Sequence, residues 1–179
     1  NLAGGAPALF TNTPGNRHTA LGSSALNKNT TASNNTASGF QALQNNTTGK
    51  ENTAMGQNAL LNNTTGSNNI ALGASAGSNL TTGSNNIDIG NVGVAAESGK
   101  IRLGTKGKQT STFIAGISGV TVPGGVGVIV DANGHLGTVV SSARVQEGIK
   151  PRAKAGEATR ARQPGRLRSK KEYNPAGQP

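Results

Sequence analysis

A motif of 17 residues recurs in phase along the first half of the chain. The segments NNTASGFQALQNNTTGK (34–50) and ENTAMGQNALLNNTTGS (51–67) are closely similar when one is shifted by 17 residues. A fixed period of about 20 residues is typical of a solenoid, whereas a disordered low-complexity segment has no need to keep phase. Six glycines mark the register: Gly5, Gly22, Gly39, Gly56, Gly73 and Gly90.

Each unit follows the consensus N-T-A-x-G-x-x-A-L-x-x-N-T-T-G-x-N. A helical repeat takes about 34 residues, so a unit this short and rich in Thr and Gly favours short strands joined by turns. Matching residues of successive coils then stack about 4.8 Å apart. We predict an all-β parallel roll in which these residues are structural: Gly22, Gly39, Gly56, Gly73, Gly90, Leu26, Leu43 and Leu60.

The core of such a roll is expected to be thin. Only 32% of the residues are hydrophobic and 2% are aromatic, which is too little for a conventional globular core. We therefore expect several rolls to pack their apolar faces together. The expected inward positions are the repeated Ala and Leu columns and the residue before each marker glycine, which is Leu21, Ser38, Met55, Leu72 or Ile89.

The spacing shortens after Gly90. The sequence NIDIG (86–90) is followed by KIRLG (100–104), a step of 14 residues. Asp88 and Arg102 take the same position in these two motifs, between alternating aliphatic residues. This register predicts an ion pair between them across adjacent coils, exposed and worth about 0–1 kcal/mol.

The repeats of residues 1–104 resemble the head domains of trimeric autotransporter adhesins of the YadA type, whose typical unit is shorter than 17 residues. The resemblance implies a left-handed parallel β-roll with three chains per head, displayed outside the cell. It implies a homotrimer that binds an unknown surface ligand (a host protein, a glycan or matrix) from the bacterial outer membrane. The chain begins at Asn1, on a repeat boundary and without Met, so we expect a targeting signal upstream.

Residues 105–140 are expected to form a β-rich connector. The sequence VGVIVDANGHLGTVV (126–140) predicts a hairpin with its turn at Asp131–Gly134. The sequence STFIAGISGVTV (111–122) predicts a strand pair or a bent strand that ends at Pro123. This connector resembles the one that joins such repeats to an endosialidase-type intramolecular chaperone in tail-fibre-like proteins, so a phage-like particle is an alternative location.

Residues 141–179 resemble a truncated and degenerate start of that chaperone. In the family, a Ser and a Lys five residues later form a self-cleaving dyad, with an Arg between them. Ser141 and Arg144 match that pattern, but Gln146 stands in the Lys position. A Ser hydroxyl needs an activating base, and Gln cannot accept a proton at useful pH. We therefore interpret these three residues as vestigial, and we predict no enzymatic activity.

The basic segment 141–179 is expected to be mostly disordered. It holds ten basic and three acidic residues and therefore carries most of the net charge of +10. Nucleic-acid binding is disfavoured because Tyr173 is its one aromatic residue, which leaves base stacking without support. No apolar run is long enough to span a membrane as a helix.

No cofactor or metal site is predicted. The chain has no Cys and two distant histidines, His18 and His135. His18 takes the Asn position of the repeat, so we interpret it as a solvated turn residue. The favoured function is a trimeric adhesive fibre segment. The alternatives are a phage-derived tail-fibre-like protein and a β-solenoid that binds ice or crystal surfaces, for which Thr19, Thr36 and Thr53 are in phase.

The broken dyad makes a direct prediction. The full chain should keep its intact mass on prolonged incubation, because Gln146 cannot activate Ser141. Intact-mass spectrometry measures this, and a product ending at Val140 would show that the chain cuts itself.

Overall fold

The computed structural model describes residues 1–117 and 122–138, which fall into two compact units. The first unit lies within Asn1–Val120 and the second begins at Thr121. The described residues form β-strands and turns, with no helix among them. Each unit is described by itself.

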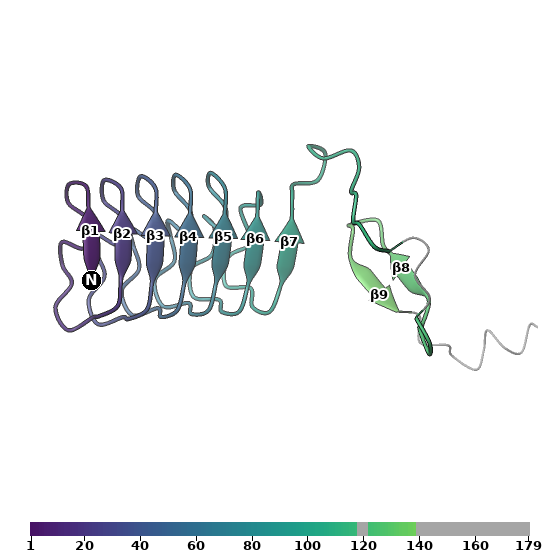
Figure 1. Cartoon of the computed structure of the whole chain (residues 1–179), viewed down its shortest axis with the longest axis horizontal. Helices are drawn as coiled ribbons and strands as arrows, with labels where there is room; N and C mark the ends of the chain where they lie inside the picture. The colour runs from purple at the N-terminus through teal and green to yellow at the C-terminus, as the bar shows by residue number, and fades with distance from the viewer. Residues whose placement is uncertain (118–121, 139–179) are drawn as a thin grey trace, which may run out of the picture. The chain divides into compact units, whose positions relative to one another are not determined.

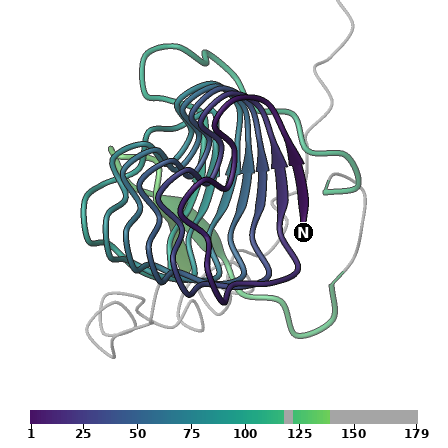
Figure 2. The same ribbon diagram turned by 90° about the vertical axis from the view of Figure 1, so that its left-hand side faces the viewer.

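The first unit is a parallel β-solenoid. Its seven strands form one sheet in chain order, and each pairs in parallel with the next (Figure 1). The register advances by 17 residues at the first five steps and by 14 at the last, as the repeats predict. Figure 2 shows the coils stacked one behind another. The strands are β1 (Leu2–Gly4), β2 (Thr19–Leu21), β3 (Thr36–Ser38), β4 (Thr53–Met55), β5 (Ile70–Leu72), β6 (Ile87–Ile89) and β7 (Ile101–Leu103).

The core is built from small side chains and one Leu in each of several coils. The middle residue of the strand points inward, and it is a fully buried Ala in β2, β3 and β4. A second Ala column at 25, 42, 59 and 76 and the leucines 26, 43 and 60 complete the core, as expected. Successive side chains of a strand point to opposite faces, so a three-residue strand has one inward position.

The expected column before each marker glycine is therefore wrong. Leu21 is 42% exposed and Met55 is 47% exposed, so both lie on the outer face of the sheet. The alternation of the strand turns its middle residue inward, and in the motif T-A-x that residue is Ala. The third strand residue faces outward together with the first.

The core leucines take an unusual backbone conformation. Leu26, Leu43 and Leu60 have φ of 49°, 52° and 51°, in the left-handed region. For a residue with a side chain this costs about 1–2 kcal/mol. Full burial of a Leu side chain offsets the cost, since it stabilises by about 1.5–3 kcal/mol. Burial of the Leu side chain therefore stabilises the strained turn that points it inward.

The second unit contains the predicted hairpin. Strands β8 (Val128–Val130) and β9 (Leu136–Thr138) pair antiparallel, and the Gly134 amide donates to the Asp131 carbonyl oxygen. The strand expected in 111–122 is absent from the described part of that range, residues 111–117 and 122. Between β7 and residue 117 the described chain makes one isolated bridge, Lys106 to Gln109.

The marker glycines predict which substitutions the roll tolerates. Gly39 has φ of 141°, and a Cβ there would lie 2.5 Å from the Gly56 carbonyl carbon of the next coil. Gly39→Ala should therefore lower the free energy of unfolding by about 3 kcal/mol, through overlap and backbone strain. Urea titration followed by circular dichroism measures the change.

Gly4→Ala is the matched control. Its Cβ would meet the flexible Leu21 side chain at 3.3 Å, and other coils carry a side chain at this position. The control should stay within about 0.5 kcal/mol of wild type. Equal effects of the two substitutions would contradict the close approach of coils at Gly39.

Candidate assembly and binding surface

The outer face of the seven-stranded sheet is a flat surface with two columns of side chains. The register places Thr19, Thr36 and Thr53 side by side in one column. Toward β7 the same column continues as Ile70, Ile87 and Ile101. None of the residues in either outward column is charged. The face thus changes from mixed polar to aliphatic along the roll.

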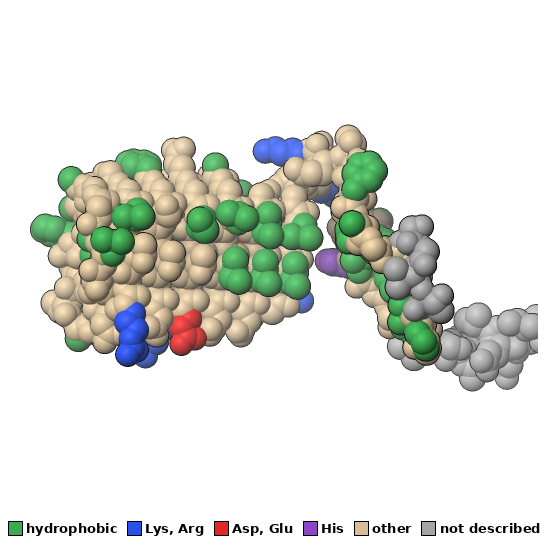
Figure 3. Space-filling view, viewed as in Figure 1, with side chains coloured by type: hydrophobic (Ala, Val, Ile, Leu, Met, Phe, Trp, Pro, Cys, Tyr) green, Lys and Arg blue, Asp and Glu red, His purple; other side chains and the backbone are tan. Residues whose placement is uncertain are grey.

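The aliphatic part forms a continuous patch, visible as two rows of apolar side chains in Figure 3. Exposed fractions reach 69% at Ile101 and 65% at Leu103. An apolar patch of this kind on a protein surface marks an interaction site. We name it the aliphatic patch and define it as Ile70, Leu72, Ile87, Ile89, Ile101 and Leu103.

Behind this face, a ladder of buried Asn side chains joins each coil to the next. The Nδ2 of Asn35 donates to the Gly49 carbonyl (2.8 Å), and its Oδ1 accepts from the backbone amide of Asn52 (2.9 Å). Asn52 and Asn69 repeat both bonds one coil further on. Each amide side chain therefore satisfies backbone groups that the narrow interior hides from water.

A second Asn ladder runs beside the first and donates to the same glycine carbonyls. Asn46 donates to the Oδ1 of Asn29 (3.0 Å) and to the Gly49 carbonyl (2.9 Å), and Asn63 repeats this pattern. Leu80 takes the next position and is buried. The ladder ends there, and the buried Oδ1 of Asn63 has no hydrogen-bond partner among the described residues.

His18 is a member of the first ladder, and its interpretation as a solvated turn residue is wrong. The side chain is 2% exposed. Its Nδ1 accepts from the Asn35 amide (3.3 Å), and its Nε2 lies 2.9 Å from the Ala32 carbonyl. These contacts fit a neutral ring protonated on Nε2, which copies the acceptor and donor of Asn. Burial lowers the pKa of His18 below its ordinary value of 6.5.

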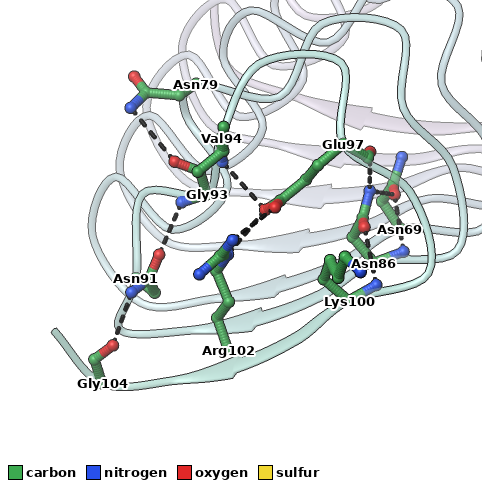
Figure 4. Close-up of polar contacts among 10 residues, drawn as sticks. All are labelled: Asn69, Asn79, Asn86, Asn91, Gly93, Val94, Glu97, Lys100, Arg102 and Gly104. Atoms are coloured by element: carbon green, nitrogen blue, oxygen red, sulfur yellow. Dashed lines mark hydrogen bonds and ion pairs between the residues drawn. The ribbon is translucent and has the colours of Figure 1, made fainter. Parts of the chain in front are cut away.

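The predicted ion pair of Asp88 and Arg102 is also wrong, although their register is right. Arg102 instead binds Glu97 in a bidentate contact, Nε to Oε1 at 2.8 Å and Nη2 to Oε2 at 2.6 Å (Figure 4). Hydrogen bonding to Arg102 lowers the pKa of Glu97. Glu97 follows β6 in a loop, so strand register gives no sign of this contact.

Asp88 occupies the inward position that Ala holds in β2 to β5. It is 1% exposed, and neither carboxylate oxygen has a hydrogen-bond partner among the described residues. Burial raises the pKa of Asp88 to about 6, and the charge of Glu97 adds to the rise. Sequence reasoning missed this burial because Asp is rarely buried unpaired.

The remaining predicted residues divide into two groups. The structural glycines and leucines lie in successive coils, where they shape the turns and fill the core. Ser141, Arg144 and Gln146 lie outside the described residues, so the loss of self-cleavage stays a prediction. Within residues 1–117 and 122–138, no group of three His, Cys, Asp or Glu side chains could hold a metal ion. The same residues contain no helix that could cross a membrane.

The sheet and its ladders make the chain a repeat protein of the parallel β-solenoid class. Compared with protein-family models, curated proteins and solved structures, it matches none of them. The resemblance to adhesin heads and to tail-fibre connectors therefore remains a prediction, and the functional argument depends on the surface itself.

The buried ring of His18 predicts a pH effect on the roll. Because its folded pKa is lowered, the unfolded chain binds the proton more readily, and stability falls as pH drops below about 6.5. A protonated Nδ1 could no longer accept from the Asn35 backbone amide, which would cost about 1–3 kcal/mol of the free energy of unfolding. His18→Asn should remove this loss and so stabilise the roll in acid relative to wild type.

Urea unfolding of wild type and His18→Asn at a pH above and a pH below 6.5 measures the difference. His135→Asn is the control, because that exposed ring lies in the second unit. The pH dependence of the roll should be unchanged in the control. The same acid-induced loss in His18→Asn as in wild type would show that the ring does not titrate as a ladder member.

Proposed function

We propose that the chain is a non-catalytic segment of a trimeric surface fibre with an adhesive role. The observation that carries this proposal is the aliphatic patch on the flat outer face of the sheet. A roll whose core is mainly Ala stabilises itself weakly, and the same sheet leaves its largest aliphatic side chains in water. Covering the patch with other copies of the roll removes both disadvantages.

The outer face suits contact between copies. Its two columns carry no charge, which is typical of the centre of a protein interface. Parallel rolls in register would bring each patch against the patches of its neighbours along a common axis. Three copies agree with the resemblance to trimeric heads, and each chain would then expose its turns outward.

The outward turns would supply the binding surface for a host protein, a glycan or matrix. They present Asn, Ser and Thr side chains at every coil, including the exposed residues Asn34, Thr48 and Asn68. Identical groups repeated along a rigid rod allow many weak contacts to act together. The fibre would stand on the bacterial outer membrane or on a phage-like particle.

Substitution at the centre of the patch tests the assembly. Leu72→Glu combined with Ile89→Glu should give monomers where the wild-type chain gives trimers, because six like charges would meet at the axis. Both residues are partly exposed, so the fold of one roll should be kept. Light scattering coupled to gel filtration measures the mass, and circular dichroism checks the fold.

Phe10→Glu combined with Phe40→Glu is the matched control. These side chains are 75% and 48% exposed and lie outside the strands. The control should remain trimeric. Fluorescently labelled full chains in solution then test adhesion to glycan arrays, matrix proteins and cultured cells, and the patch variant should adhere less than the control because it is monovalent.

Other outcomes would contradict parts of the proposal. A wild-type monomer would refute the trimer, and a trimer without adhesion would refute the adhesive role. A monomer that produces thermal hysteresis would favour ice binding, which the in-register row of Thr19, Thr36 and Thr53 supports. The polar part of the outer face, which carries this Thr row, would then be the surface that binds ice.

A further inference from the structure

Asp88 is a titratable residue at the inward strand position that Ala occupies in β2 to β5. It sits on β6, in register with the buried Ala71 of β5. On its other sides lie the loops after β5 and β6: a Cβ added at Gly77 would lie 3.5 Å from Asp88 Oδ2, and one added at Gly93 would lie 2.8 Å from it. The backbone of Gly93 therefore lies directly against the carboxylate.

The charged groups near Asp88 come from two of the elements packed against it. Glu97 belongs to the loop of residues 91–97, and Arg102 belongs to β7. The residues of β5 and of the loop before β6 that lie next to Asp88, Ala71 and Gly77, carry no charge. Arg102 is already committed to Glu97 through two hydrogen bonds.

Hydrogen bonds hold the loop 91–97 closed, and two of them come from the preceding coil, where the Gly77 and Asn79 backbone amides donate to the carbonyl oxygens of Asn91 (2.8 Å) and Val92 (2.9 Å). The Asn91 side chain donates to the Gly104 carbonyl (2.7 Å), and its Oδ1 accepts from the Gly93 amide. Glu97 accepts from the Val94 amide (3.0 Å), and its carbonyl oxygen accepts from Asn86 (2.8 Å). Val92 and Val94 are exposed, so the loop adds little apolar burial to hold it in place.

We propose that loop 91–97 is a proton-operated cover, closed over Asp88 when its carboxyl group is neutral and opened when the group ionises. A neutral carboxyl is tolerated beside Gly77 and Gly93, whereas an unpaired buried carboxylate is strongly disfavoured. Opening of the loop admits water to the carboxylate and relieves that penalty. The device is independent of assembly, since Asp88 faces the core and not the aliphatic patch.

The direction of the pH dependence follows from the raised pKa of Asp88. The folded value of about 6 exceeds the ordinary 3.8, so folding with the loop closed favours the protonated form. The contribution of Asp88 to stability is therefore full below about 3.8 and is lost as the pH rises through about 6. Hydrogen bonding to Arg102 lowers the pKa of Glu97, which favours its ionised form.

Amide hydrogen exchange on the full chain tests the proposal. After correction for intrinsic exchange rates, the amides of Val94 and Glu97 should exchange up to about a hundredfold faster above pH 6 than below about pH 3.8, since two pKa units correspond to that factor. Peptides from the β3 and β4 coils should show no such change. Wild-type loop amides that exchange equally below about pH 3.8 and above pH 6 would overturn the proposal.

Two variants identify the titrating group. Asp88→Ala restores the residue of the other coils, and Asp88→Asn keeps the shape without the charge. Either should keep the loop protected at both pH values, so the proposal stays testable even if one variant folds poorly. Glu51→Gln removes an exposed carboxylate and should leave the wild-type transition in place. A transition that persists in both Asp88 variants would assign it to another group and refute the proposal.

Discussion

The structure depends on the satisfaction of backbone polar groups in the buried interior of each coil. Each buried Asn of the first ladder accepts from one backbone amide and donates to one backbone carbonyl, both in the following coil. Its length and its two-ended chemistry suit this task, and an apolar residue there would leave two groups unpaired. This requirement explains a composition so rich in Asn and so poor in large apolar residues. The period of 17 residues is the spacing at which the Asn side chain of one coil reaches the backbone amide of the equivalent Asn in the next coil.

The ladders also explain why the last coils differ from the others. Gly77 replaces the Leu of earlier coils, and Leu80 replaces the Asn, so the apolar side chain moves three residues along the turn. The second Asn ladder stops at Asn63, and Asp88 and Arg102 take the place of the inward Ala. A solenoid must end in a coil that tolerates water on one side. The bidentate contact of Arg102 with Glu97 places charge at that end, where the regular interior stops.

Periodicity was sufficient to predict the strands, their parallel order and their register, because one position in each coil needs a glycine and another needs a small residue. It was insufficient to orient the strand. In T-A-L the pattern allows either Leu21 or Ala20 to face inward. In the structure Ala20 is buried and Leu21 is exposed. His18 was misjudged because its ladder role depends on a ring geometry that copies Asn. The sequence did not predict the aliphatic patch, because several of its residues were expected to face the core.

The uniform bonding between coils has an evolutionary consequence. Since every regular coil presents the same donors and acceptors to the next, a gene that gains or loses one repeat unit by unequal recombination keeps its reading frame and its fold. Each such event would lengthen or shorten the rod by one strand spacing, about 4.8 Å, without disturbing the distinct coils at its end. The reach of the rod can therefore be tuned by copy number, independently of the chemistry displayed on it.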